Sequence, residues 1–354
     1  MKTFQKFQNN IENIPTITSW YLADLSEAKG KQELFTKQSP QKLKVLREHA
    51  LIESAVSSNR IEGVLVDQKR VATVVFGKTH LKDRDEEEVR CYRTALDWIH
   101  KEGTRIPITE KTILKLHQMS RGEIWDAGKY KRKDVDIIEK LPGGKERVRF
   151  KTVGHSKTPD FMNELVDDWQ EALKERKIHP LIALGAFNLD FLCIHPFRDG
   201  NGRISRLLLL VQCYVLGIEV GRYISLERLI EQNKERYYET LQQSSQGWHE
   251  GKHDPWPYIN YLLYVLKTAY QEFENRVGQI KSPRGAKTEL ITQAVKQQEG
   301  VFQVSDIQRN CSGASLDLIR LTFKNLKAQG VIDCIEHGKY AKWMKVNPKR
   351  KSKG

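Results

Sequence analysis

The sequence has few cysteines, and they are scattered. Its five cysteines among 354 residues form no C-x-x-C pair, and the histidines do not cluster around them. This spacing favours neither a zinc site nor a disulfide framework, and it fits a reducing cytoplasmic compartment. Cys193 and Cys213 stand in apolar helical patterns and are expected to be buried thiols.

Long hydrophobic runs are also lacking. No apolar run approaches the roughly 18 residues that cross a membrane, and the opening residues MKTFQK lack the apolar stretch of a secretory signal. We therefore expect no membrane partner. Hydrophobic residues make up 39% and charged residues 29% of the chain, a balance typical of globular proteins. At roughly 100–200 residues per domain, the length predicts two or three domains.

Acidic residues are scarce at the C-terminal end. From Lys281 to Gly354 there are 15 Lys and Arg against 6 Asp and Glu, which places +9 of the net charge of +14 in the last fifth of the chain. Such an asymmetry indicates either a segment that faces nucleic acid or a solvated basic tail.

Helical periodicity dominates the rest of the chain, and it predicts an all-α fold class. The segment before Pro40 gives no interpretation, and no internal repeat is present. The predicted helices are Pro40 to Ser58, Glu87 to His100, Thr109 to Met119, Pro159 to Arg176, Ala183 to Cys193, Arg203 to Leu216, Ser225 to Ser244 and Trp256 to Val277.

One segment departs from this pattern. Val135-Asp-Ile-Ile and Val148-Arg-Phe are rich in β-branched and aromatic residues, and Pro-Gly-Gly at 142–144 supplies the chemistry of a turn. A lone hairpin is marginal by itself, so we expect a functional flap on the surface more than a core sheet.

A small unit follows a linker that contains Ser282-Pro-Arg-Gly. Its sequence predicts helices at Thr288 to Gln298, Val304 to Asn310 and Ser315 to Gln329, and then two short strands around His337-Gly338. Three helices and a hairpin resemble a winged helix. Its basic residues on the third helix, the wing and the tail are Arg320, Lys324, Lys327, Lys339, Lys342, Lys349, Arg350, Lys351 and Lys353. These favour phosphate contact, but the third helix lacks a base-reading pair, so both DNA binding and protein docking remain open.

The most informative stretch is IHPFRDGNGRISR, residues 194–206. Pro196 ends an apolar helix just after His195, and a Gly200-Asn-Gly202 turn then leads into a second helix. A glycine-rich turn at a helix N-terminus presents free N–H groups to an anion, and Arg203 and Arg206 share one face of that helix. Asp199 beside this site is a candidate Mg²⁺ ligand, and His195 is a candidate base.

This stretch resembles the signature of the Fic family, H-x-F-x-[D/E]-G-N-G-R-x-x-R. Every fixed position is present, namely His195, Phe197, Asp199, Gly200, Asn201, Gly202, Arg203 and Arg206. Gly202 is similar to the residue of the AMP-transferring branch, whereas a lysine usually stands there in the kinase branch. The resemblance covers roughly Leu43 to Val265 and implies a helical Fic core with a β-hairpin flap.

The resemblance also implies roles for these residues. His195 would deprotonate a Ser, Thr or Tyr hydroxyl of a target protein, which attacks the α-phosphate of ATP. Asp199 would hold Mg²⁺, and the three turn residues would cradle the α- and β-phosphates. Arg203 would contact the β-phosphate and Arg206 the γ-phosphate, while Phe197 would anchor the loop.

Two further segments resemble the family. Residues 128–137 are similar to the entry to its flap, and Val135, Asp136 and Ile137 would pair with the target backbone. Tyr237 or Tyr238 would lie beside adenine, although core aromatics at helical spacing explain them nearly as well. Asn188 and Ser245 depart from residues that many relatives carry, which leaves the choice of nucleotide base less secure than the phosphate chemistry.

An inhibitory segment is also indicated. Ser58-Asn-Arg-Ile-Glu-Gly63 is similar to the family's pattern [S/T]-x-x-x-E-[G/N]. Gly63 can end a helix in the left-handed conformation, which leaves Glu62 at the unfavourable end of the helix dipole and in need of an arginine. The resemblance names Arg206 as that partner, so pairing would withhold this arginine from the γ-phosphate. The alternative is a solvated Glu before a helix-ending Gly.

The sequence thus predicts a protein adenylyltransferase with four regions. These are 1–100 with the inhibitory helix, 101–278 as catalytic core, 285–346 as winged-helix unit and 347–354 as basic tail. Expected partners are ATP and a target protein with a hydroxyl side chain, and the chain itself is one candidate target. The C-terminal unit is expected to bind DNA or protein, and pairing with a second copy of the chain stays open. The rival functions are transfer of another nucleotide or of phosphate, and a DNA-binding regulator with a secondary Fic domain.

Overall fold

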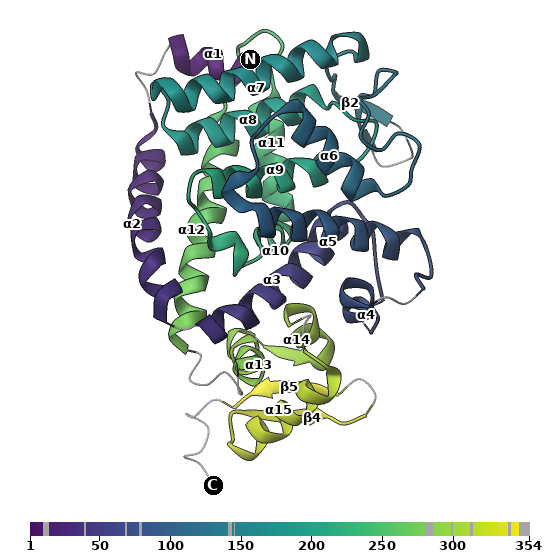
Figure 1. The fold of residues 1–354 in the computed structure, drawn as a ribbon. Coiled ribbons are helices and arrows are strands. Elements are labelled where there is room, and N and C mark those ends of the chain that lie inside the picture. Colours follow the sequence, from purple (N-terminus) through teal and green to yellow (C-terminus); the bar gives the residue numbers. More distant parts are fainter. Residues whose placement is uncertain are drawn as a thin grey trace.

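The computed structural model describes residues 1–9, 14–38, 40–67, 69–77, 80–140, 144, 146–279, 286–298, 300–311, 314–338 and 341–346. Helices make up most of it, and none of those described is long and apolar enough to cross a membrane. The expected all-α body with a β-hairpin is confirmed (Figure 1).

The body is built from twelve helices and one hairpin in the described part of the chain. They are α1 (Lys2–Asn9), α2 (Thr16–Gln38), α3 (Pro40–Ile61), α4 (Val71–Phe76), α5 (Arg84–Glu102), α6 (Glu110–Arg121), β1 (Ile137–Lys140), β2 (Glu146–Phe150), α7 (Thr158–Glu175), α8 (Pro180–Ile194), α9 (Asn201–Val215), α10 (Leu226–Gln232), α11 (Lys234–Ser245) and α12 (Trp256–Gln279). Short 3₁₀ turns lie at Gly103–Arg105, His155–Lys157 and Val220–Arg222.

Helix α8 is the centre of the body, because its sequence is apolar on all sides. Every residue from Leu181 to Ile194 is buried, and α1, α7, α9 and α12 pack around it. A helix without a polar face is stable only when other elements cover it completely. The end of α8, which carries the predicted catalytic histidine, is therefore held in a fixed position.

The N-terminal segment, which had no interpretation from sequence, packs against the body. Helix α1 packs on α8, and α2 packs along α12 (Figure 1). The α-amino group of Met1 is buried between Glu164 and Asp168 of α7. The Thr3 hydroxyl donates to the buried carboxylate of Asp190 at 2.6 Å.

One predicted helix is wrong in its extent. Residues 225–244 form two helices, α10 and α11, which are separated at Asn233 with φ −121° and ψ 36°. The Asn233 side chain donates to the Leu229 carbonyl at 3.2 Å, and such local bonds let asparagine compete with helical continuation. The break lets α10 pack on α3 while α11 packs on α12.

The hairpin pairs β1 with β2 in antiparallel register, with Ile138 opposite Val148. A register irregularity separates Ile137 from Ile138, and the described part of its turn is Gly144 with φ 77°. The Leu141-Pro-Gly part of the predicted turn lies outside the described residues. Ile138 and Val148 are both about half exposed, so one face of the hairpin is free for contact.

The C-terminal unit contains α13 (Ala286–Gln297), β3 (Val301–Gln303), α14 (Val304–Asn310), α15 (Leu316–Ala328), β4 (Ile332–Glu336) and β5 (Lys342–Lys345). The three predicted helices and two strands are present, and the sequence analysis missed β3, which pairs with β5. This sheet has the order β3-β5-β4. The winged-helix assignment stays a prediction, and the predicted linker from 281 to 285 and the tail from 347 lie outside the described residues.

Two buried clusters divide the chain. One runs from Met1 to Leu290, and the other runs from Ile291 to Ile332. The first cluster crosses the predicted boundary at residue 100, which falls inside α5. The predicted division near residue 285 lies close to the point where the clusters change, within α13.

Candidate active site

His195 takes its position from the end of α8. Its backbone is left-handed, with φ 54° and ψ 60°, and its N–H donates to the Phe191 carbonyl at 3.0 Å. A left-handed conformation is uncommon for a residue with a side chain and persists only where the surroundings hold it. Lys131 helps to stabilise this conformation. Its backbone N–H donates to the Pro196 carbonyl at 2.9 Å, and its Nζ donates to the Ile194 carbonyl at 3.2 Å.

The environment keeps the His195 imidazole neutral. Burial and the nearby positive charge of Lys131 lower its pKa to about 4. Nδ1 is buried and makes no hydrogen bond within the described part of the chain, so Nε2 is the nitrogen that can meet a substrate. A neutral imidazole at physiological pH can accept a proton.

The loop after His195 is closed by its own side chains. The Asn201 amide bonds to both backbone groups of Phe197, accepting from its N–H at 2.9 Å and donating to its carbonyl at 2.8 Å. Gly200 has φ 86°, a conformation that glycine adopts without strain, and α9 begins at Asn201, two residues before the predicted start. The Asn201 side chain therefore shapes the loop, while the backbone N–H groups at the start of α9 face the anion site.

His117 of α6 supports this loop, and the sequence analysis did not find it. Its ring stacks on Phe197 with 3.8 Å between centroids. Its Nδ1 accepts from the Gly128 N–H at 2.9 Å, and its Nε2 lies 3.1 Å from the Asp199 carbonyl oxygen. Burial lowers its pKa to about 4. His117 thus ties α6 and the segment before the flap to the loop of the site.

We expect His117→Phe to lower the free energy of unfolding by about 1–3 kcal/mol, because phenylalanine retains the stacking but loses two buried hydrogen bonds. Urea denaturation followed by circular dichroism measures this change. His80→Phe, at an exposed position, is the matched control. Equal unfolding free energies for the two variants would contradict the support assigned to His117.

Asp199 lies at the rim of the site with its side chain half exposed. Oδ1 accepts from the Gly200 N–H at 2.6 Å, and Oδ2 pairs with Arg121 at 2.9 Å. Burial acts to raise the pKa of Asp199, but Arg121 and Arg203 outweigh it and hold that pKa below its usual value. The carboxylate is therefore ionised, and each oxygen retains a lone pair for a further partner.

The two arginines of α9 are held from α3 and α5. Arg203 donates to Glu88 at 2.5 Å and to Oδ1, the side-chain amide oxygen of Asn59, at 3.3 Å. Arg206 donates to the Ser58 hydroxyl at 2.9 Å and to the Ser58 backbone carbonyl at 3.0 Å. Both guanidinium groups are nearly fully buried. Asn59, Glu88 and Arg121 carry no motif signal, which explains why the sequence analysis missed them.

Glu62 faces Arg206 as expected from the sequence. Its Oε1 accepts from Arg206 Nη2 at 2.7 Å, and Gly63, with φ 89°, follows the end of α3. Burial acts to lower the pKa of Arg206, but Glu62 outweighs it and raises that pKa. A Cβ atom at Gly202 would collide with Glu62 Oε1. The Glu62 carboxylate therefore lies against the first turn of α9, where an anion would bind.

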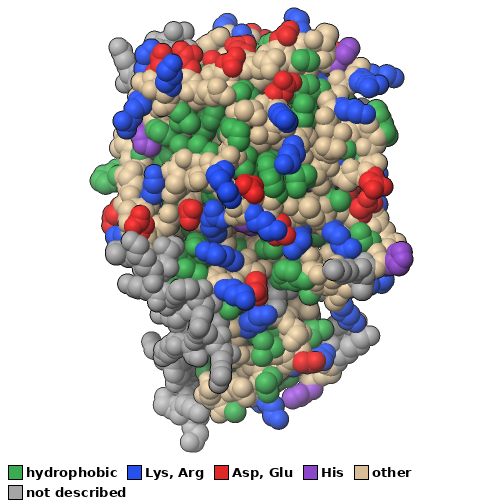
Figure 2. Space-filling model, viewed as in Figure 1, with side chains coloured by type: hydrophobic (Ala, Val, Ile, Leu, Met, Phe, Trp, Pro, Cys, Tyr) green, Lys and Arg blue, Asp and Glu red, His purple; other side chains and the backbone are tan. Residues whose placement is uncertain are grey.

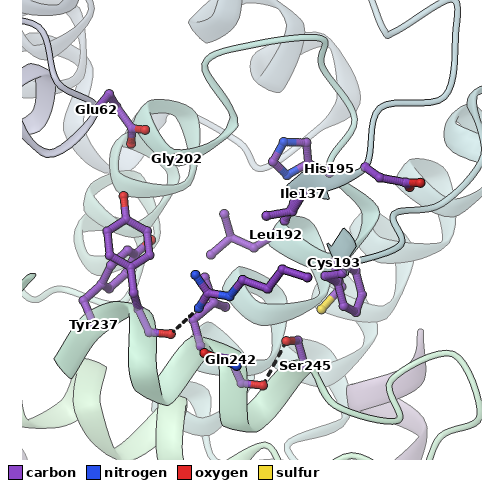
Figure 3. Close-up of a pocket in the computed structure, with 14 residues that line it drawn as sticks. Glu62, Ile137, Leu192, Cys193, His195, Gly202, Tyr237, Gln242 and Ser245 are labelled. Atoms are coloured by element: carbon purple, nitrogen blue, oxygen red, sulfur yellow. Dashed lines mark hydrogen bonds between the residues drawn. The ribbon is translucent and has the colours of Figure 1, made fainter. Parts of the chain in front are cut away.

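A cavity of about 270 Å³ lies between His195, Glu62 and the start of α9 at Gly202. Glu62 and His195 lie on different sides of it, and Tyr237, Gln242 and Ser245 line the side formed by α11 (Figure 3). Predicted residues that also line it are Asp136, Ile137, Gly202 and Tyr238, and lining residues that the sequence analysis missed are Arg149, Phe150, Leu192, Cys193, Leu241 and Gln242.

Several predicted residues serve mainly as support. Tyr237 is buried against Tyr258 and Tyr261, with 6.0 and 5.9 Å between ring centroids, although it also borders the cavity. The Asn188 amide bridges the Ser205 carbonyl and the Tyr258 hydroxyl. The Val135 carbonyl accepts from the Thr152 hydroxyl at 2.7 Å, which secures the base of the hairpin.

Comparison with known proteins gives three findings. Residues 107–213 match the Fic/DOC family. The Protein adenylyltransferase Fic of Drosophila willistoni is 28% identical over 107 residues, which are 30% of this chain and 19% of that protein. The protein of the same name from Drosophila melanogaster is 23% identical over 210 residues, which are 53% of this chain and 38% of that protein. The matches thus span a minor part of these curated relatives.

Solved structures share the fold. A Fic family protein from Desulfovibrio desulfuricans G20 aligns with a TM-score of 0.60 and 21% identity, covering 95% of this chain and 97% of that one. Fic-1 from C. elegans aligns with a TM-score of 0.58 and 18% identity, covering 75% of this chain and 74% of that one.

Proposed function

Because residues 107–213 of this chain form a Fic/DOC family domain, we propose that it is a protein adenylyltransferase that moves AMP from ATP to a hydroxyl of a target protein. The observation that carries this proposal is the arrangement of one cavity. It is lined by a neutral His195, the start of α9 at Gly202, and the aromatic residues Tyr237 and Tyr238. Such a cavity offers a base, an anion site and a surface for a planar ring.

The chemistry follows from these positions. His195 Nε2 accepts the proton of a Ser, Thr or Tyr hydroxyl, and the hydroxyl oxygen attacks the α-phosphorus of ATP. The bond from the α-phosphorus to the bridging oxygen breaks, and pyrophosphate leaves. The N–H groups of Asn201 and Gly202 at the start of α9 and the guanidinium groups of Arg203 and Arg206 stabilise the charge on the phosphates, while the Gly200 N–H donates to Asp199. Positioning and charge compensation supply most of the catalysis.

Asp199 fits the role of Mg²⁺ ligand. No group of three or more His, Cys, Asp or Glu in the described residues could form a cage for a metal ion. Mg²⁺ bound with substrate phosphates needs only one or two protein carboxylates, and the half-exposed, ionised Asp199 beside the start of α9 meets this need. When bound, the ion would neutralise charge on the phosphates of ATP.

The ion pair of Glu62 with Arg206 supports autoinhibition. Nε and Nη2 of Arg206 donate to Ser58 and Glu62, and the Glu62 carboxylate lies where the γ-phosphate would meet α9. ATP then binds in an unproductive position or not at all. Movement of the end of α3 would release Arg206.

The hairpin is proposed to receive the target. Asp136 and Ile137 border the cavity at the edge of β1, so an extended peptide that pairs with this edge places its hydroxyl near His195. The exposed apolar side chains of Ile138 and Val148 would pack against that peptide.

The test is incubation of the Glu62→Gly variant with ATP, Mg²⁺ and a cell lysate, followed by mass spectrometry of labelled proteins and of the chain itself. We expect the mass of AMP on a Ser, Thr or Tyr. Addition of UMP or of phosphate would replace adenylylation by one of the rival transfers. A chain without any transfer to proteins or to itself would overturn the proposed function.

A second function rests on the C-terminal unit. Figure 2 shows Lys and Arg side chains across the middle of one face and over part of this unit. The Arg320 side chain is 67% exposed on α15, and Lys324 is exposed beside it, whereas Lys327 pairs with Asp333 at 2.9 Å. This surface suits phosphate contact, and it suits an acidic protein equally well.

We expect the full chain to bind duplex DNA weakly, with an affinity that falls steeply as salt rises. Fluorescence anisotropy at two salt concentrations measures this, and the double variant Arg320→Ala/Lys324→Ala should weaken binding. The control is the double variant Lys174→Ala/Lys177→Ala, which removes two positive charges from α7 and the turn after it. If no binding is found at low salt, protein docking is the function left for the unit.

A further inference from the structure

A second cavity lies where the C-terminal unit meets the helical body. It encloses about 210 Å³ between α3, α10 and α12 of the body and α13 and α14 of the unit. Figure 1 shows α13 beneath the ends of α3 and α12. Leu290 of α13 belongs to the buried cluster of the body, and its neighbour Ile291 belongs to that of the unit. The cavity therefore lies where the two buried clusters meet, and both the body and the C-terminal unit contribute to its walls.

The wall on the side of the body is a network of buried charges. Glu53 of α3 lies 3.2 Å from Arg228, 3.9 Å from Arg276 and 3.3 Å from His49. Both arginines also pair with Glu272 of α12. Two carboxylates thus balance two guanidinium groups. Because Arg228 also donates to Gln232, all of its terminal nitrogens have partners.

Unused hydrogen-bond donors remain at the same cavity. Arg276 Nη1 and Gln293 Nε2 make no hydrogen bond in the described part of the chain. Arginine and amide nitrogens can only donate, so the surplus is one of donors. The matching ligand carries acceptor oxygens.

We propose that this cavity binds a small molecule with a carboxylate or phosphate group and that its occupancy weakens the inhibition by Glu62. The oxyanion would accept from Arg276 and Gln293, which brings α12 and α13 to one ligand. The regulatory half of this inference rests on the proposed function, whereas the binding half does not.

Helix α3 connects the cavity to the active site. Glu53 and Glu62 are nine residues apart, which corresponds to about 13 Å along a helix. Between them, Ser54 bonds to Glu227 and Arg60 pairs with Glu231, so α3 and α10 are joined along this length. An oxyanion on Arg276 competes with Glu53 for the guanidinium. The tie of α3 to α12 then weakens, and the end of α3 that carries Glu62 can move away from Arg206.

Binding is tested by isothermal titration calorimetry of the full chain with inorganic phosphate and, separately, with succinate, in a buffer free of both groups. We expect saturable binding of at least one of them. Gln293→Leu keeps the size of the side chain but removes the donor, and it should weaken binding about tenfold or more. Arg276→Lys, which keeps the charge beside Glu272, should weaken it as well.

The matched control is Gln298→Leu. Gln298 lies just after α13, bonds to the Ala294 carbonyl and does not border the cavity. It should bind as the parent does. Both glutamine variants retain the start of α9, so any phosphate or succinate that binds there contributes equally to the two titrations. No saturable binding, or equal affinity of Gln293→Leu and Gln298→Leu, which would mean an adventitious ion only, overturns the proposal.

Regulation is tested with the ligand that binds. It should raise self-labelling of the parent chain by ATP several-fold, and it should leave the Glu62→Gly variant unchanged because inhibition is already absent there. An equal effect on both would disprove the path through α3. If Glu62→Gly shows no transfer at all, the proposed function fails, and the binding result still decides whether the cavity is a site.

Discussion

Replacing His195 by alanine is expected to lower AMP transfer by about 10²–10⁴-fold, because the target hydroxyl loses its general base. The structure gives the reason for so large an effect. Burial and Lys131 keep this imidazole neutral, and its left-handed backbone at the end of α8 directs it into the cavity. Transfer is measured as incorporation of labelled AMP into the chain itself, in the Glu62→Gly background.

The variant should still fold and bind ATP, since the buried Nδ1 of His195 has no hydrogen-bond partner in the described part of the chain. A thermal melt and nucleotide titration check this. His80→Ala is the control, because it removes a histidine at an exposed position that does not border the cavity. Self-labelling by His195→Ala at the rate of its parent would show that the assigned mechanism is wrong.

The pH dependence gives an independent readout of the same group. A histidine whose pKa is lowered to about 4 is in its basic form above that pH. The value of kcat/KM for the parent should therefore stay flat as the pH falls through 6.5 and decline only toward 4, over the range in which the chain stays folded. A midpoint near 6.5 would mean that the imidazole is not shielded as the structure shows.

Replacing Glu62 by glycine is expected to raise AMP transfer by roughly 10–100-fold, which corresponds to the loss of one charge-assisted hydrogen bond that competes with ATP. Oε1 of Glu62 lies 2.7 Å from Nη2 of Arg206, and its carboxylate is pressed against Gly202 at the start of α9. Without it, Arg206 can bind the γ-phosphate. Initial rates of self-labelling at fixed ATP and Mg²⁺ measure the gain.

Two further variants separate this effect from a general loosening of the chain. Glu62→Gln removes the charge but adds no glycine flexibility, and it should also raise the rate. The double change Glu62→Gly/Arg206→Ala should return transfer to a low level, because the gain depends on that arginine. A well-folded Glu62→Gly protein with unchanged or lower activity would reject the inhibitory role.

The grouping of the main residues of the candidate site could be predicted because they are contiguous. His195 to Arg206 span the end of α8, one turn and the start of α9, so local rules for proline, glycine and helix termini place them together. The same holds for the end of α3, where Glu62 precedes a left-handed Gly63. Apolar periodicity was sufficient to predict most helices, since each buries one face or, for α8, all of them.

Contacts between distant segments could not be predicted in this way. His117 is 82 residues from Asp199, Glu88 is 115 from Arg203, and Ser58 is 148 from Arg206. His117 and Glu88 stand in no local pattern, and the inhibitory pattern that contains Ser58 does not name its bond to Arg206. These pairings depend on how α3, α5, α6 and α9 pack. Strand β3 was missed for the same reason, because it is stabilised by pairing with β5. The break at Asn233 was missed because apolar periodicity does not show the local hydrogen bond of its side chain to Leu229.

The sequence by itself therefore determined the helical fold class and the order of chemical groups along the catalytic loop, because backbone geometry and side-chain periodicity act over a few residues. Only the tertiary structure decided which groups meet. It placed Arg121 on Asp199, Glu88 on Arg203 and α13 against α3. The physical reason is that buried charges must find partners wherever the packed helices bring them, and packing depends on the whole chain.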